Sequence, residues 1–299
     1  MLEHRRDQAS RLREEIEAGR RRPPNSSSSS AVIGAPRGLV VAIASGKGGV
    51  GKTTAAVNIA AVLAASLKVT LVDADLGVAN ADILCGVEAR RRLGRDHDAA
   101  QVATPTPYGF DLIAGAVGPG VEQNPDAAGP LVRTLAVLAA KRDVVIVDLG
   151  AGVGRFVTGV MAAADRSIIV TTPEPTAQAD AYMLFKCLRR RLDASGIGGA
   201  SLDGRLGVIV NMANGHDEGR MAHRRLRATT ERFLRWSPSL LGAIRRDASV
   251  SKAVGRRKPL VVASRGRPAA KDLHAIGDRL ATMVGSSVEA SALGRRAIR

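Results

Sequence analysis

Short runs of apolar residues alternate with longer stretches in which apolar positions recur at helical spacing, from residue 39 almost to the end of the chain. An apolar run without polar alternation is typical of a strand buried on both faces of a sheet. The predicted strands are residues 39–44, 68–72, 109–114, 144–147, 167–171, 206–210 and 239–244. The predicted helices between them are residues 55–65, 127–141, 154–163, 176–192, 218–235 and 271–284. This order predicts an α/β fold with three layers, in which helices cover both faces of a mostly parallel sheet.

The first 37 residues differ in composition from the rest of the chain. The first 22 are highly charged, and Ala9, Leu12 and Ile16 lie on one helical face, which predicts a flexible N-terminal helix that needs a partner to be stable. Two prolines and a run of serines then predict a linker. The predicted limits are 1–22 for this helix, 23–37 for the linker, 38–284 for one folded domain and 285–299 for a basic C-terminal tail.

Basic residues outnumber acidic ones, with 44 Lys and Arg against 28 Asp and Glu and a formal net charge of +16. This balance favours polyanionic partners such as nucleotides, nucleic acid or an anionic membrane surface. The arginines are scattered along the whole chain, so a genomic bias toward arginine explains the charge equally well. The two cysteines form neither a disulfide framework nor a metal-binding spacing. Because we find no signal peptide and no apolar run long enough to span a membrane, we expect a cytoplasmic protein.

The segment GKGGVGKTT at residues 46–54 fits the phosphate-loop pattern, in which Gly, four residues, Gly and Lys precede Ser or Thr. It lies between a predicted strand and a predicted helix, so backbone N–H groups and a helix N-terminus would surround a phosphate. We expect Lys52 to contact the β- and γ-phosphates and the Thr53 hydroxyl to ligate Mg²⁺. The nucleotide-binding residues predicted in this loop are Gly46, Lys47, Gly48, Gly49, Val50, Gly51, Lys52, Thr53 and Thr54.

Two predicted strands end in carboxylates that can serve a bound triphosphate. Asp73 and Asp75 follow the strand at 68–72, and Asp148 follows the strand at 144–147. Such groups can hold the water shell of Mg²⁺ or orient the attacking water. The alternative for the first pair is that both are loop residues, one of which caps the next helix.

The lysine directly after the first glycine, Lys47, makes the loop resemble the deviant Walker A loop of the ParA/MinD ATPases. The resemblance implies ATP and Mg²⁺ as ligands and a Lys47 that crosses a dimer interface to the nucleotide of the other subunit. It also implies that Asp75 activates the water, while Asp73 and Asp148 support the metal through water. The predicted catalytic residues are Lys47, Lys52 and Asp75, and the predicted metal site comprises Thr53, Asp73 and Asp148. Alternatively, Lys47 is one more solvated basic residue.

Asn211 follows the predicted strand at 206–210, and the same resemblance implies that it reads the edge of the adenine. The alternative is a strand-end turn residue. Residues 244–247 occupy the place of the second adenine-side loop of the family, so Asp247 is included among the nucleotide-binding residues. A proline is usual near Arg245, and the sequence departs from the family at that point.

The N-terminal segment indicates a branch of this family. Residues 7–13, DQASRLR, match the Asp-Gln-Ala-x-x-Leu-Arg motif that opens the FlhG proteins, also called FleN or YlxH, which are MinD-like ATPases that set flagellar number and placement. Segments at 73–82 and 171–182 agree with this resemblance. The alternative for the heptapeptide is the start of an ordinary charged helix. The resemblance gives a GTPase-activating segment comprising Asp7, Gln8, Ala9, Leu12 and Arg13.

The resemblance implies a slow, regulatory ATP hydrolase that dimerises around two nucleotides and controls flagellar number or placement. Its implied partners are a second copy of the chain, flagellar switch-complex proteins, the SRP-type GTPase FlhF, which residues 1–22 would stimulate, and a weakly contacted anionic inner membrane. One alternative is a ParA-like DNA-partition ATPase, which DNA binding with a steep salt dependence would favour. The other is a regulatory protein that binds ATP without hydrolysing it.

Overall fold

The computed structural model describes residues 38–75, 79–92, 102–115, 128–194 and 204–296. The predicted N-terminal helix, the linker and the segment from Asp7 to Arg13 lie outside the described residues, as do residues 76–78 between the predicted carboxylates and the next helix. The chain separates into two units, Met1–Ala35 and Pro36–Arg299, and the description below concerns the second.

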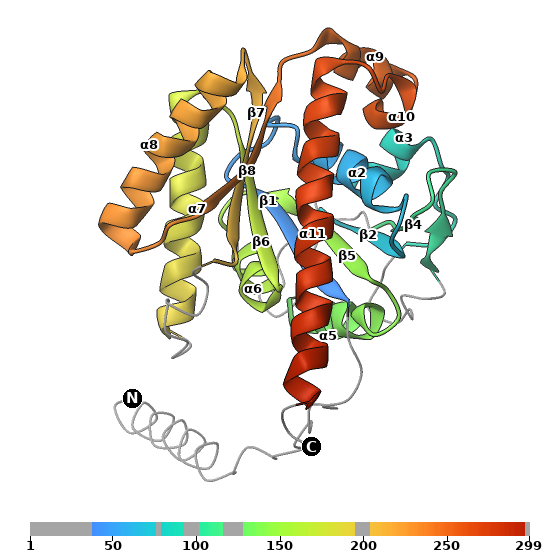
Figure 1. Ribbon diagram of the computed structural model, residues 1–299, viewed down its shortest axis with the longest axis horizontal. Coiled ribbons are helices and arrows are strands. Elements are labelled where there is room, and N and C mark those ends of the chain that lie inside the picture. The colour runs from blue at the N-terminus through green and yellow to red at the C-terminus, as the bar shows by residue number, and fades with distance from the viewer. Residues whose placement is uncertain (1–37, 76–78, 93–101, 116–127, 195–203, 297–299) are drawn as a thin grey trace, which may run out of the picture. The chain divides into compact units, whose positions relative to one another are not determined.

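In the described part of the chain, eight strands form one sheet in the order β3-β4-β2-β5-β1-β6-β7-β8 (Figure 1). The short β3 runs antiparallel to β4, and every other neighbouring pair is parallel. The strands are β1 (Leu39–Ser45), β2 (Val69–Ala74), β3 (Thr104–Pro105), β4 (Asp111–Ile113), β5 (Val144–Ala151), β6 (Arg166–Thr171), β7 (Leu206–Ala213) and β8 (Ser239–Arg245).

Helices cover both faces of this sheet, which confirms the predicted three-layer α/β fold. One face packs against α5 (Ala128–Ala139), α6 (Arg155–Ala163), α7 (Pro175–Ala194) and α8 (His216–Leu234). The other packs against α2 (Lys52–Leu63), α3 (Ala81–Cys85), α9 (Ala248–Gly255), α10 (Leu260–Ala263) and α11 (Pro268–Arg296). Along β1, Val40 and Ala42 belong to the first core, whereas Val41 and Ile43 belong to the second. Successive side chains of a strand point to opposite faces, so a strand buried on both sides must be apolar throughout.

Several elements differ from the prediction. The short helices α3, α9 and α10 and the strand β3 were not predicted, because each is shorter than the window over which periodicity can be recognised. The last helix, α11, begins at Pro268 and continues to Arg296, beyond the predicted domain limit at 284. In the described part of the chain, no helix is long and apolar enough to cross a lipid bilayer.

The predicted functional residues lie where parallel strands end. The phosphate loop follows β1, Asp73 lies near the end of β2, Asp148 lies within β5, and Asn211 lies within β7. Because these strands are parallel neighbours or near neighbours, their carboxyl ends meet along one edge of the sheet. Asp73 and Asp148 are aligned as partners across β2 and β5. The topology therefore brings the separate sequence motifs to one site.

Candidate functional site

The phosphate loop turns sharply from β1 into α2. Gly51 is the N-cap of α2 and has a φ of 82°, in the left-handed region that favours glycine. A Cβ at Gly51 would lie 2.3 Å from Asn211 Nδ2, and a Cβ at Gly46 would lie 2.2 Å from the backbone oxygen of Asp180 on α7. Both glycines therefore allow close packing of the loop against β7 and α7. The first turn of α2 begins at Lys52, which leaves its free N–H groups facing the loop.

Lys52 lies at the centre of the predicted phosphate and metal residues. Its side chain is 6% exposed, and its Nζ lies 2.6 Å from Asp148 Oδ1 and 3.9 Å from Asp75 Oδ2. The same Nζ donates a hydrogen bond of 3.4 Å to Thr53 Oγ1. The fold therefore brings the lysine, the hydroxyl and two of the three predicted carboxylates together.

Asp148 fits the role of a carboxylate that holds metal-bound water. It is fully buried; Oδ1 accepts the hydrogen bond from Lys52, whereas Oδ2 has no hydrogen-bond partner among the described residues. Burial raises the pKa of Asp148 above its usual range, and the positive charge of Lys52 opposes that rise. A buried carboxylate oxygen without a partner is unfavourable unless water or a cation satisfies it. The donor set of Thr53 and Asp148 is therefore compatible with Mg²⁺, with Thr53 as the direct ligand.

Asp73 is committed to the backbone of the loop that follows it. Its Oδ1 accepts a hydrogen bond of 3.1 Å from Asp75 N, and its Oδ2 accepts bonds of 3.0 Å from Asn80 N and Ala81 N. Burial and the neighbouring Asp148 charge raise the pKa of Asp73 to about 6. Asp73 thus binds backbone N–H groups at residues 75, 80 and 81, and the last of these lies in the first turn of α3. This is the arrangement expected if one of the two aspartates caps the next helix. The contribution of Asp73 to the metal site stays a prediction.

Asp75 is the more accessible of the two carboxylates, with 27% of its side chain exposed. Besides facing Lys52, it lies against Gly150 in β5, where a Cβ would come within 3.4 Å of Asp75 Oδ1. An accessible carboxylate between the phosphate loop and β5 can accept a hydrogen bond from a water placed beyond the phosphates. This position is compatible with the predicted catalytic role.

Lys47 contacts its own subunit. Its Nζ lies 3.2 Å from Glu174 Oε2 and 3.1 Å from Thr176 Oγ1, both at the start of α7. The side chains of Lys47 and Glu174 are 35% and 60% exposed, so the pair lies at the surface. No role for Glu174 or Thr176 was predicted from the sequence, although both belong to a segment that resembles the family. The only signal in the sequence was that likeness.

The two residues predicted on the adenine side have different surroundings. Asn211 Nδ2 donates a hydrogen bond of 2.8 Å to Val50 O, so Asn211 lies directly against the phosphate loop. The side chain of Asp247 is 1% exposed and caps α9 by accepting a hydrogen bond of 2.8 Å from Ser249 N. Arg267 Nη2 also lies 3.2 Å from Asp247 Oδ1. The carboxylate of Asp247 is therefore held by its own fold, and its contact with a nucleotide stays a prediction.

Comparison with known proteins agrees with this geometry. A family model described as the CobQ/CobB/MinD/ParA nucleotide binding domain matches residues 41–260. The antiactivator FleN of Pseudomonas aeruginosa is 36% identical over 227 residues, which cover 73% of this chain and 78% of that protein. The flagellum site-determining protein YlxH of Helicobacter pylori is 32% identical over 267 residues, which cover 85% of this chain and 84% of that protein.

Among solved structures, the septum site-determining protein MinD from Pyrococcus horikoshii, complexed with Mg-ADP, has a TM-score of 0.67. The match covers 83% of this chain and 98% of that chain at 22% identity, which is a likeness of fold. The family model and the two flagellar relatives carry the assignment further, because they match the sequence itself over most of its length. The chain belongs to the MinD/ParA family of nucleotide-binding proteins, and within it to the FleN/FlhG (YlxH) branch.

Proposed function

We propose that this protein is a Mg²⁺-dependent ATP hydrolase that dimerises when it binds ATP and thereby controls flagellar number or placement. The observation that carries this proposal is the cluster around Lys52, where the ammonium group lies between Asp148 and Asp75 at the start of α2. Phosphate-loop ATPases of the MinD/ParA family are generally ATP hydrolases, and the cluster supplies the groups that hydrolysis requires.

Each group has a task that follows from its surroundings. Lys52 exchanges its contact with Asp148 for the β- and γ-phosphates, and the N–H groups at the start of α2 bind the same oxygens. The Thr53 hydroxyl and, through water, Asp148 would hold Mg²⁺, which offsets the negative charge of the phosphates when it is bound. Asp75 orients the attacking water, because its carboxylate is accessible and lies beside the loop.

The proposed dimer depends on Lys47. To reach a nucleotide in the other subunit, its ammonium group must leave Glu174 and Thr176. An exposed ion pair costs little to break, so the contacts of a bound triphosphate can outweigh it. Dimerisation would then follow ATP binding, and hydrolysis would limit the lifetime of the dimer.

The flagellar role rests on the relatives named FleN and YlxH. For this chain we propose two kinds of protein partner: an SRP-type GTPase such as FlhF, stimulated through Gln8 and its neighbours in residues 1–22, and flagellar switch-complex proteins. Contact with an anionic membrane surface would be weak, because residues 286–299 carry only scattered apolar residues and lack a bulky apolar face, while three arginines lie in the last five positions.

A DNA-partition role is the second candidate, since α8 exposes several arginines. Two of them are already engaged on the same helix, Arg220 with Asp217 and Arg227 with Glu231. These internal ion pairs lower the positive charge that α8 offers to DNA. A log–log plot of DNA affinity against salt concentration with a slope of several units would favour this candidate.

Calorimetric titration of Mg-ATP into the purified full-length protein tests the proposal. Lys52→Ala should weaken ATP binding by roughly 30-fold or more, because it removes a buried cation from the phosphate site. Lys141→Ala is the matched control, since this exposed lysine precedes β5 at the opposite edge of the sheet. If the wild type does not bind ATP, or if Lys52→Ala binds it as tightly as Lys141→Ala, the proposal is wrong.

A further inference from the structure

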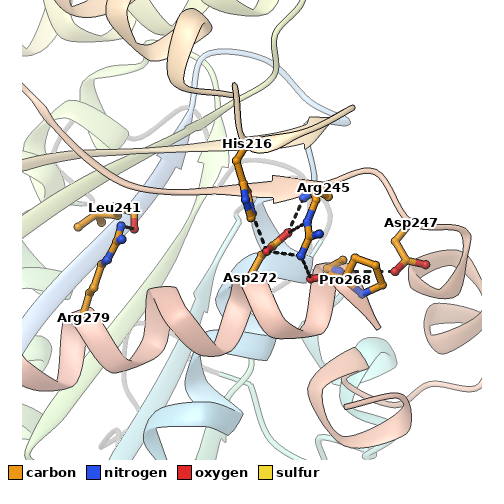
Figure 2. A network of polar contacts seen from close by, with 8 residues as sticks. His216, Leu241, Arg245, Asp247, Pro268, Asp272 and Arg279 are labelled. Carbon is orange, nitrogen blue, oxygen red and sulfur yellow. Dashed lines mark hydrogen bonds and ion pairs between the residues drawn. The ribbon is translucent and has the colours of Figure 1, made fainter. Parts of the chain in front are cut away.

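One carboxylate on α11, that of Asp272, joins the end of β8 to the start of α8 (Figure 2). Its side chain is 5% exposed. Arg245, the last residue of β8, binds it twice: Nε lies 2.9 Å from Oδ2, and Nη2 lies 2.9 Å from Oδ1. His216, the first residue of α8, places its Nε2 2.9 Å from the same Oδ1. Two loops at the carboxyl edge of the sheet are therefore fixed to one point on α11.

Backbone hydrogen bonds connect Asp272 and the end of β8 to β7. The N–H of Arg245 donates to Asp272 Oδ2 at 2.9 Å, and the next N–H, that of Arg246, donates to Ala213 O at 2.7 Å. A proline at position 245 could not donate the first of these bonds, because it has no N–H. Arg245 thus provides both the backbone donor and the guanidinium group for Asp272.

The end of β7 also contacts the phosphate loop. Met212, which precedes Ala213, has a φ of 57°, a conformation that is unfavourable for a residue with a side chain. Its N–H donates to Asn211 Oδ1 at 2.8 Å, while Asn211 Nδ2 donates to Val50 O at 2.8 Å. The turn that carries Asn211 is therefore held on one side by the phosphate loop and on the other by the strand end that Asp272 fixes.

The charge of Asp272 is stabilised by the same partners. Burial would raise its pKa, but the hydrogen bonds from Arg245 and His216 outweigh burial and lower the pKa below the usual range of a carboxyl group. The side chain is therefore ionised near neutral pH, and a neutral side chain of the same shape would lose most of the attraction to Arg245.

We infer that Asp272, with Arg245 and His216, is a positioning cluster for the nucleoside end of the nucleotide, which sets where Asn211 can meet the base. The inference rests on the proposed function, since it takes the ligand to be an adenine nucleotide. Asp272 does not touch the ligand in this arrangement; it acts through the backbone of residues 245–246 and 211–213.

A purely structural role for these contacts is the competing explanation, because they also attach α11 to β8. Another contact between α11 and β8 serves as a control for this explanation. Arg279, two helical turns further along α11, donates from Nη1 to Leu241 O in β8 at 2.6 Å (Figure 2). This contact joins the same helix to the same strand, but it lies far from the carboxyl end of β8. Loss of the Arg279 contact should therefore cost stability without changing nucleotide recognition.

The test compares two ligands on the full-length protein, Mg-ATP and inorganic tripolyphosphate with Mg²⁺, each measured by displacement of a fluorescent ATP analogue. Asp272→Asn and Arg245→Met should each weaken ATP binding by about tenfold, because a buried charge-assisted contact is lost, and leave tripolyphosphate binding within about twofold of the wild type. Arg279→Met should change neither affinity. Lys52→Ala should weaken both, because it acts on the phosphates.

The outcomes separate this inference from the proposed function. If the wild type binds no ATP, the proposed function fails and the inference fails with it. If the wild type binds ATP but the Asp272 and Arg245 variants keep its affinity, or lose both ligands to the same extent, the positioning role is wrong and the proposed function stands. If Asp272→Asn does not fold, Arg245→Met decides alone, because it keeps the backbone N–H of position 245 and the buried carboxylate.

Discussion

The ammonium group of Lys47 lies 3.2 Å from the carboxylate of Glu174, within one subunit. The lysine that the family resemblance assigns to the other subunit's nucleotide therefore contacts residues of its own subunit at the start of α7. The same Nζ also donates to Thr176 Oγ1 at 3.1 Å. In the proposed dimer, contacts within the subunit and contacts across the interface would compete for this one side chain.

This competition gives a first prediction. Glu174→Gln should release Lys47 and strengthen ATP-dependent dimerisation by up to about fivefold, the range expected for an exposed ion pair. Lys47→Ala should bind ATP yet remain monomeric. Light scattering with and without ATP measures both variants. Asp193→Asn is the control, because it breaks the exposed Arg189–Asp193 pair on the same helix, and it should leave dimerisation unchanged. A dimeric Lys47→Ala protein would contradict the proposed dimer.

A second prediction concerns Asp75. Asp75→Asn should bind ATP but reduce phosphate release by about 100-fold or more, because it removes the carboxylate that orients water. ATP-bound dimers should then accumulate. Asp111→Asn is a matched control: its side chain is 26% exposed, close to the 27% of Asp75, and it pairs with Arg142 away from the phosphate loop. If Asp75→Asn hydrolyses ATP at the wild-type rate, a group other than Asp75 orients the attacking water.

The phosphate loop and the strand-end carboxylates could be predicted from sequence because the signal is local. The loop has a fixed spacing of Gly, Lys and Thr, and each carboxylate directly follows an apolar run that forms a strand. Parallel pairing of β2, β5 and β1 then places these groups together without any further information. Lys52 and Asp148 meet for that reason, and Asp73 lies opposite Asp148 on the neighbouring strand.

The remaining contacts depend on residues far apart in the chain. Lys47 and Glu174 are separated by 127 positions, and Arg245 and Asp272 by 27, so no local pattern links either pair. Asp247 illustrates a second limit. Its position after β8 matched a ligand-binding loop, but its carboxylate caps α9, a helix too short to be recognised from periodicity. The sequence therefore did not predict that Asp247 caps α9, and the contact of Asp247 with a nucleotide stays a prediction.

Asp247 gives a third prediction, on stability and pH. Burial would raise its pKa, but hydrogen bonds from Ser249, Arg267 and Ala269 outweigh burial and lower the pKa to about 2. A carboxyl group with a lowered pKa stabilises the fold above its unfolded pKa of about 3.9, and this contribution is lost as the pH falls toward 2. Asp247→Ala should therefore reduce the free energy of unfolding by about 1 kcal/mol at pH 7, the usual value of a helix cap.

Thermal unfolding at several pH values measures this effect. The melting temperature of Asp247→Ala should lie a few degrees below that of the wild type at pH 7, and the two should converge as the pH falls below about 4. Asp278→Ala, an exposed aspartate on α11, should match the wild type throughout. A difference that stays constant down to pH 3 would show that the charge of Asp247 contributes nothing to the cap.

The last prediction concerns Gln8, which lies outside the described residues. A glutamine amide can orient an attacking water, as the water-positioning glutamine of small GTPases does. Ala9, Leu12 and Ile16 would provide an apolar stripe for docking, and the serine-rich linker would let residues 1–22 reach a second protein while the ATPase domain forms its own dimer. We therefore expect the full-length protein, and a peptide of residues 1–22, to stimulate GTP hydrolysis by the cognate SRP-type GTPase.

Gln8→Ala should lower that stimulation by roughly tenfold or more, since it removes the group that positions the water. Ser10→Ala, in the same segment but with no part in the apolar stripe, is the control and should stimulate as the wild type does. GTP turnover of the partner, with ATP held constant, is the measurement. If the peptide is inert and full-length Gln8→Ala stimulates as well as the wild type, residues 1–22 do not activate the GTPase. The ATPase domain would then have to act on its partners through its own surface.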